Sequence, residues 1–211
     1  MDPVLAFVSI AAAIAVGAAS PGPSFVLVAR TSIAVSRRAG FATALGMGIG
    51  GVFFASLALL GLHALLSQVG WLYAVLKLAG GTYLLYLAFR IWRGATAPLE
   101  VADEGRTAPA GLMRPLLFGL LTQLTNPKTA LVYGSIFAAL LPAEPPVWLF
   151  VVLPPAIFLI ETSWYAIVAA AFSAGRPRAA YLRSKRWVDR AAAAAIGGLG
   201  VRLMSDTVSR P

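Results

Sequence analysis

The sequence contains no cysteine and only one histidine, His63. The lack of cysteine excludes disulfides, thiolate metal sites and thiol redox chemistry. A single histidine argues against a metal site built from imidazoles. We therefore expect neither a bound metal nor another cofactor.

Charge is also scarce: Asp, Glu, Lys and Arg make up 12% of the chain, and hydrophobic residues 59%. A soluble domain carries roughly 25% charged residues. A membrane-spanning helix needs about 20 mostly apolar residues, and such stretches follow one another until the chain is used up. The composition indicates an integral membrane protein, with lipid around it and no sizeable soluble domain.

The net charge is +9. In a soluble protein this excess would suggest a nucleic-acid partner, but in a membrane protein it marks cytoplasmic loops. We expect no nucleic acid. The N-terminus has no Lys or Arg before Arg30, whereas a signal peptide begins with a positive charge. The first apolar segment is therefore expected to be retained as a helix.

The hydrophobic pattern predicts an all-α membrane protein with about six transmembrane helices. The two segments that contain "PGP" and "NPK" are long, as interrupted or tilted helices are. The sixth is short, and Asp189 and Arg190 weaken its start. The six segments are Val4–Val28, Gly40–Leu66, Trp71–Trp92, Leu112–Leu141, Pro146–Phe172 and Val188–Met204.

The basic residues predict the orientation, because Lys and Arg are enriched in cytoplasmic loops. They gather in the odd-numbered loops, at 30–39, 93–114 and 173–187. The second and fourth loops, "HALLSQVG" and "LPAEPPVW", contain none. The odd loops are therefore predicted to be cytoplasmic, with both termini on the outer side.

The segment 94–111, rich in Ala, Gly and Pro, is predicted to be a flexible linker. It divides the chain into halves, 1–93 and 112–211, with three spans each. Because three is odd, two related halves would lie upside down relative to each other, as in the inverted repeats of secondary transporters. The first span of each half carries a proline break, which supports the repeat.

These breaks are the most informative feature of the sequence. Proline kinks or ends a helix, and broken backbone survives in lipid only where protein buries it or water reaches it. Paired breaks in two halves point to a transporter's binding site. The alternative is that both are kinks that only assist packing. The breaks comprise Ser20, Pro21, Gly22 and Pro23 in the first half, and Asn126, Pro127 and Lys128 in the second.

Asn126 is a favoured N-cap and Pro127 a favoured first helical residue, so "NPKT" predicts the start of a half-helix. Such a start presents N–H groups and a positive dipole end, and Lys128 adds a full charge. Together they predict an anion site suited to a carboxylate. The first break does the same more weakly, with Ser20 or Ser24 as the cap.

Two further charges lie inside predicted spans, where charge is costly and functional by default. Lys77 is a candidate for coupling, with snorkelling to the interface as the alternative. Glu161 could bind a substrate amino group or carry a proton, or it could form a structural ion pair.

The glycines of the membrane segments favour close helix packing within or between protomers, so a homo-oligomer is compatible with them. The positions assigned to packing are Gly46, Gly50, Gly80 and Gly81.

The chain resembles the LysE/RhtB family of bacterial amino-acid exporters. The resemblance rests on "SPGPSFVLVARTSIAVSRRAGFATALGMGIG", "LKLAGGTYLLYLAFRIWR" and "GLLTQLTNPKTALVY". It implies a multi-pass protein of the inner membrane that exports an amino acid, with the proton gradient as driving force. It also implies roles for Pro21, Gly22, Pro23, Lys77, Gly80, Asn126, Pro127 and Lys128.

The sequence thus predicts a secondary transporter with alternating access to a midplane site and a small-molecule substrate. Three alternatives remain: a cation or metal exporter, which calls for several intramembrane carboxylates, a membrane-embedded enzyme, which needs a catalytic cluster, and a structural membrane component. No motif distinguishes lysine from threonine, leucine or homoserine as substrate.

Overall fold

The computed structural model describes residues 2–66, 70–96 and 111–208, and all of its regular structure in these ranges is helical. The helices are α1 (Pro3–Ala19), α2 (Pro23–Ala34), α3 (Arg37–Leu66), α4 (Gly70–Gly94), α5 (Met113–Thr125), α6 (Pro127–Leu140), α7 (Val147–Phe172) and α8 (Gly175–Val208).

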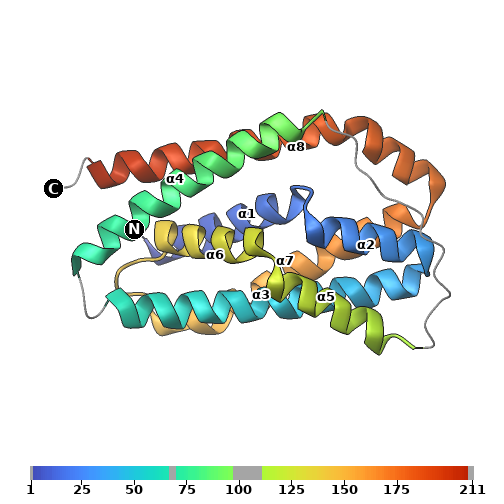
Figure 1. Ribbon diagram of the computed structural model, residues 1–211. Coiled ribbons are helices and arrows are strands. Elements are labelled where there is room, and N and C mark those ends of the chain that lie inside the picture. Colours follow the sequence, from blue (N-terminus) through green and yellow to red (C-terminus); the bar gives the residue numbers. More distant parts are fainter. Residues whose placement is uncertain (1, 67–69, 97–110, 209–211) are drawn as a thin grey trace.

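The helices form three groups (Figure 1). The long helices α4 and α8 pack along each other on one side of the molecule. On the other side α3 packs along both α5 and α7. The short helices α1, α2 and α6 lie between these groups, so the ends of short helices fall in the middle of the protein (Figure 1).

Both interruptions predicted from proline are confirmed. The first apolar segment divides into α1 and α2, which meet at an angle of 56°. The fourth divides into α5 and α6 at Asn126. In each case a proline opens the second helix, Pro23 in α2 and Pro127 in α6, where the missing N–H costs nothing.

The helices differ in their capacity to cross a membrane. Two stretches are long and apolar enough, Arg37–Gly61 within α3 and the whole of α7. The bent α1–α2 pair adds a third if it counts as one span. The described part of the chain therefore has two or three candidate spans by length and composition, half or fewer of the six predicted.

Two predicted loops are much shorter than expected. The loop at 30–39 reduces to Val35–Ser36, and that at 173–187 to Ser173–Ala174. The sixth segment, predicted to be short and to start at Val188, begins at Gly175 and belongs to a helix of 34 residues. Arginine and alanine are good helix formers, so a helix can continue through a basic stretch. The basic residues indicate where the chain leaves the lipid, and they do not mark the end of a helix. Most of the predicted linker, 97–110, lies outside the described residues.

The packing explains how an apolar chain distributes its side chains. Large aliphatic and aromatic residues fill the space between the three groups, with Ile14, Phe137 and Leu153 fully buried. Many other large apolar residues lie exposed on the outer surface. Apolar exposure of this extent is unusual for a protein in water and is expected for one surrounded by lipid. Examples on α3 and α7 are Phe53, Leu60, Val147, Val151, Leu159 and Ile167.

Candidate functional site

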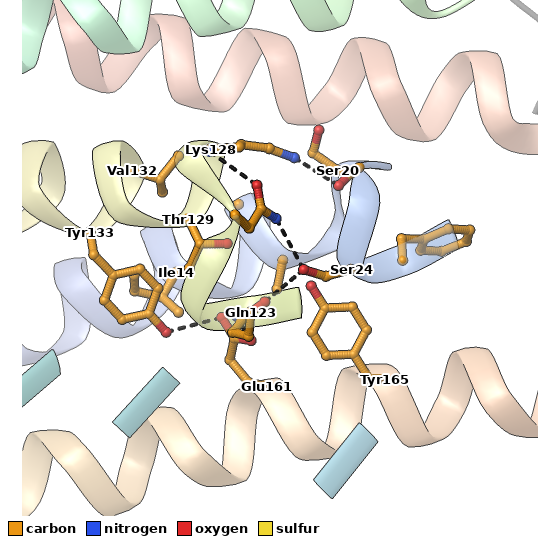
Figure 2. Close-up of a pocket in the computed structure, with 15 residues that line it drawn as sticks. Ile14, Ser20, Ser24, Gln123, Lys128, Thr129, Val132, Tyr133, Glu161 and Tyr165 are labelled. Carbon is orange, nitrogen blue, oxygen red and sulfur yellow. Dashed lines mark hydrogen bonds between the residues drawn. The ribbon is translucent and has the colours of Figure 1, made fainter. Parts of the chain in front are cut away.

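The two helix breaks meet in one buried cavity of about 30 Å³. Side chains from five helices line it, and Figure 2 shows their polar groups pointing toward one another. The polar lining residues are Ser20, Ser24, Gln123, Asn126, Lys128, Thr129, Tyr133, Glu161 and Tyr165.

Asn126 organises the second break and joins it to the first. Its side-chain oxygen accepts a hydrogen bond from the main-chain N–H of Lys128 at 3.0 Å, which makes it the N-cap of α6 as predicted. Its amide Nδ2 donates to Ser24 Oγ on α2, also at 3.0 Å. One buried side chain thus fixes where α6 begins and how α2 lies beside it.

Lys128 reaches from the second break to the first. Its Nζ donates a hydrogen bond of 2.9 Å to the main-chain carbonyl of Ser20, the C-cap of α1. A cation is favoured there because the helix dipole is negative at its C-terminus. Gly22 lies directly beside this side chain, since a Cβ at that position would be in ordinary contact with Lys128 Nζ at 3.4 Å.

A chain of hydrogen bonds continues from the breaks to Glu161 on α7 (Figure 2). Ser24 Oγ donates to Gln123 Oε1 at 2.6 Å, and Gln123 Nε2 donates to Glu161 Oε2 at 2.7 Å. Tyr133 OH donates to the other carboxylate oxygen at 3.0 Å. Glu161 is buried, so both of its oxygens are held by neutral donors.

No cation pairs with Glu161 at ion-pair distance within the described ranges, where the ion pair recorded is Lys185–Asp189. A buried carboxylate without a counter-ion is costly. It is stabilised by taking up a proton or by receiving a positively charged group. Lys128 lines the same cavity but makes no ion pair with Glu161.

The structure brings together Ser20, Gly22, Asn126, Lys128 and Glu161 from the predicted set. The predicted capping by Ser20 or Ser24 is wrong: the N-cap of α2 is Gly22, with no side-chain cap. Ser20 ends α1, and Ser24 already lies inside α2, where its hydroxyl bonds to Gln123. Lys77 belongs to α4, but its side chain is outside the described part.

The predicted packing glycines lie away from the cavity. Gly46 and Gly50 face α5, where a Cβ at Gly46 would collide with the main chain of Leu116. Gly80 faces the main chain of Ser135 on α6, and Gly81 faces α8.

Sequence reasoning missed Gln123, Tyr133 and Tyr165. Gln123 offered a signal, since it is a polar residue in an apolar run three positions before Asn126. The two tyrosines offered none, because tyrosine is common in membrane helices at the interfaces. Only the packing of α6 and α7 turns them toward the cavity.

A buried polar cavity where two interrupted helices meet, in a chain of mostly apolar helices, defines a membrane transporter. The chain belongs to the LysE-type translocator family, whose profile matches residues 15–207. It is a translocator and not an enzyme, which removes the membrane-enzyme alternative.

Relatives extend over nearly the whole chain. The threonine efflux protein of Escherichia coli K12 is 32% identical over 95% of this chain and 98% of its own length. The uncharacterized membrane protein YahN of the same strain is 34% identical over 90% of this chain and 85% of its own. A leucine efflux protein of Enterobacter sp. strain 638 is 31% identical over 56% of this chain and 54% of its own. No solved structure matches.

Proposed function

We propose that this protein exports an amino acid across the bacterial inner membrane, by alternating access to the cavity at the two helix breaks. The observation that carries the proposal is the meeting of both breaks and Glu161 in one buried polar cavity. The efflux activities named for its threonine and leucine relatives support the substrate class.

The carboxylate of the amino acid would bind at the breaks. The Lys128 ammonium is held there by a neutral carbonyl, and an anionic ligand is a stronger partner for it. Ser20 Oγ is buried and without a hydrogen-bond partner among the described residues, so it is a further donor. The uncapped start of α2 at Gly22 adds its positive dipole end.

The amino group, or a coupling proton, would bind at Glu161. A zwitterion in low dielectric needs both of its charges matched. Lys128 and Glu161 supply the opposite charges on the lining of one cavity. Exchange of the substrate ammonium for a proton at Glu161 would couple export to the proton gradient.

The cavity is too small for an amino acid in this conformation. Its volume is about 30 Å³, and a single water needs about 10–15 Å³ by the same measure. The structure therefore represents a closed state in this proposal. Binding requires the short helices to separate from α7, on one side of the membrane at a time.

The packing supports an inverted repeat with six spans, in which α1–α2, α3 and α4 correspond to α5–α6, α7 and α8. Exchange of the two halves maps the contacts of α1 with α6 and α7 onto those of α5 with α2 and α3. The α3–α7 and α4–α8 pairs map onto themselves. The α4–α6, α2–α3 and α1–α8 contacts have no equivalent of similar extent, so the symmetry is approximate.

The orientation follows from the exposed arginines. The α2–α3 and α7–α8 turns lie at one end of the molecule, opposite the start of α1 and the end of α8 (Figure 1). Arg37 and Arg38 follow the first turn, and Arg183 and Arg186 lie in the first half of α8, all exposed. By the positive-inside rule, these arginines support an orientation with this end in the cytoplasm.

The test is efflux from cells that lack this protein and from cells that overproduce it. Both are loaded with dipeptides, and all amino acids in the medium are profiled. We expect one or a few amino acids to appear selectively with the protein. Lys128→Ala and Asn126→Ala should lose this export while still inserting in the membrane, and Arg183→Ala, at an exposed position, should retain it.

Two results would contradict the proposal. One is a flat amino-acid profile with confirmed membrane insertion. The other is normal export by both Lys128→Ala and Asn126→Ala.

A further inference from the structure

A second cavity lies beside the polar one, between the α4–α8 pair and the short helices α1 and α6. Its volume is about 220 Å³. The lining is aliphatic apart from Ser9, and its larger side chains are Val16, Leu84, Ile136, Ile196 and Leu199.

The two cavities share a wall. Gly17 on α1 and Val132 on α6 line both of them. The wall is thin at this point, since a Cβ at Gly17 would lie 3.4 Å from Val132 Cγ1. Lys128, Val132 and Ile136 follow one another at intervals of four along α6 and therefore share one face. The polar cavity and the aliphatic cavity are thus neighbours, separated at this point by Gly17 and Val132.

The two cavities differ in volume and in the groups that they offer to a ligand. The polar one has room for about two waters, and offers groups for a carboxylate and an ammonium. The aliphatic one, at about 220 Å³, exceeds the roughly 150 Å³ that holds a benzene molecule in a protein interior. An aliphatic side chain fits there without displacing any polar contact.

We propose that this aliphatic cavity receives the side chain of the transported amino acid, and that the substrates are branched aliphatic amino acids of the leucine, isoleucine and valine type. The inference rests on the proposed function and adds the substrate class. A charged or amide side chain is disfavoured because the lining offers it one hydroxyl at most, and a buried polar group without a partner is costly. Gly17 and Val132 would control passage between the two cavities.

The experiment fills the cavity and measures selectivity. Ala12 lines the cavity and is exposed, so Ala12→Leu adds bulk there without a buried clash. Ala15→Leu is the matched control, since Ala15 is exposed on the same helix and absent from the cavity lining. The readout is the ratio of leucine to alanine exported from dipeptide-loaded cells, with membrane insertion checked by immunoblot.

We expect the unaltered protein to favour leucine over alanine. Ala12→Leu should lower this ratio by about tenfold or more, because it adds three carbons to the pocket and one methylene already changes selectivity by about tenfold. Ala15→Leu should leave the ratio unchanged. Val132→Ala, which opens the wall, should raise the export of phenylalanine relative to leucine.

The outcomes distinguish an error in the side-chain pocket from an error in the proposed export function. If the protein exports amino acids but Ala12→Leu leaves the ratio unchanged, the side-chain pocket is wrong, the cavity belongs to a lipid chain, and the proposed function stands. Preferred export of charged amino acids would overturn the inference in the same way. If no amino acid is exported, both the inference and the proposed function are wrong.

Discussion

The ammonium of Lys128 donates a hydrogen bond to the main-chain carbonyl of Ser20, 2.9 Å away, and so links two separately interrupted helices. The contact stabilises the end of α1 and the start of α6 at once. It also holds a positive charge, only partly buried, on the lining of the cavity. A ligand anion that draws Lys128 away would release the end of α1, which connects binding to movement of a helix.

Substitutions at Gly22 test how closely Lys128 must approach this helix break. Its φ is −163°, an extended conformation that any residue adopts, so only side-chain space decides the effect. Gly22→Ala places a Cβ 3.4 Å from Lys128 Nζ, an ordinary contact, and should retain export. Gly22→Val should displace the lysine and reduce export, with an overpacking cost of about 1–3 kcal/mol. Efflux and thermal unfolding in detergent measure the two effects, and equal export by both variants would show that Lys128 has room to spare.

Glu161→Gln tests the coupling role of the buried carboxyl. Glutamine keeps the shape, and its oxygen still accepts the hydrogen bond from Tyr133. Its NH2 group then faces Gln123, whose amide has to turn over to accept from it, so the fold should be maintained with this one adjustment. Glutamine at this position cannot carry a proton or a full negative charge. We expect export against a concentration gradient to be lost in proteoliposomes with an imposed proton gradient, while exchange of labelled for unlabelled substrate persists at substrate concentrations high enough to offset weaker ammonium binding. Gradient-driven export at the normal rate would remove Glu161 from the coupling step.

Local chemistry predicted the helix breaks because proline and asparagine act on their own neighbourhood. Asn126 caps α6 and Pro127 begins it wherever the rest of the chain lies. The loops were predicted less well, since they were inferred from charge. The arginine-rich stretch 173–187 follows an apolar segment and was expected to be a loop. Most of it is helical, because α8 begins at Gly175.

Site residues could be predicted from the sequence where a charged residue stands inside an apolar segment. Glu161 and Lys128 are such residues, and both line the same cavity in the structure. The partners that hold Glu161 depend on which faces of α5, α6 and α7 meet. Tyr133 and Gln123 converge on it through tertiary packing, which the local sequence does not encode.

Two glycines make a matched test of helix packing. A Cβ at Gly46 would collide with the main chain of Leu116 and Leu120 on α5, so Gly46→Ala should force the helices apart and cost about 1–3 kcal/mol. Gly134 has nothing within 4 Å of such a Cβ, so Gly134→Ala should be neutral or stabilise α6 by up to about 1 kcal/mol. Unfolding temperatures in detergent compare the two, and equal shifts would contradict the close α3–α5 approach.

The buried ion pair of α8 provides the last test. Lys185 Nζ lies 2.7 Å from Asp189 Oδ2, with the two side chains 10% and 4% exposed, and it also donates to the main-chain carbonyl of Gly94 at 3.3 Å. The pair therefore joins α8 to the end of α4. Asp189 Oδ1 is buried and has no hydrogen-bond partner among the described residues, so the carboxylate depends on Lys185 for its compensation.

Lys185→Ala should consequently destabilise the protein by about 3–5 kcal/mol, because it leaves a buried charge unpaired. Lys185→Ala combined with Asp189→Ala should be more stable than Lys185→Ala alone, since both charges are then gone. Asp189→Ala alone completes the comparison. A double variant destabilised by the full sum of the two single effects would mean that the ion pair contributes no coupling energy.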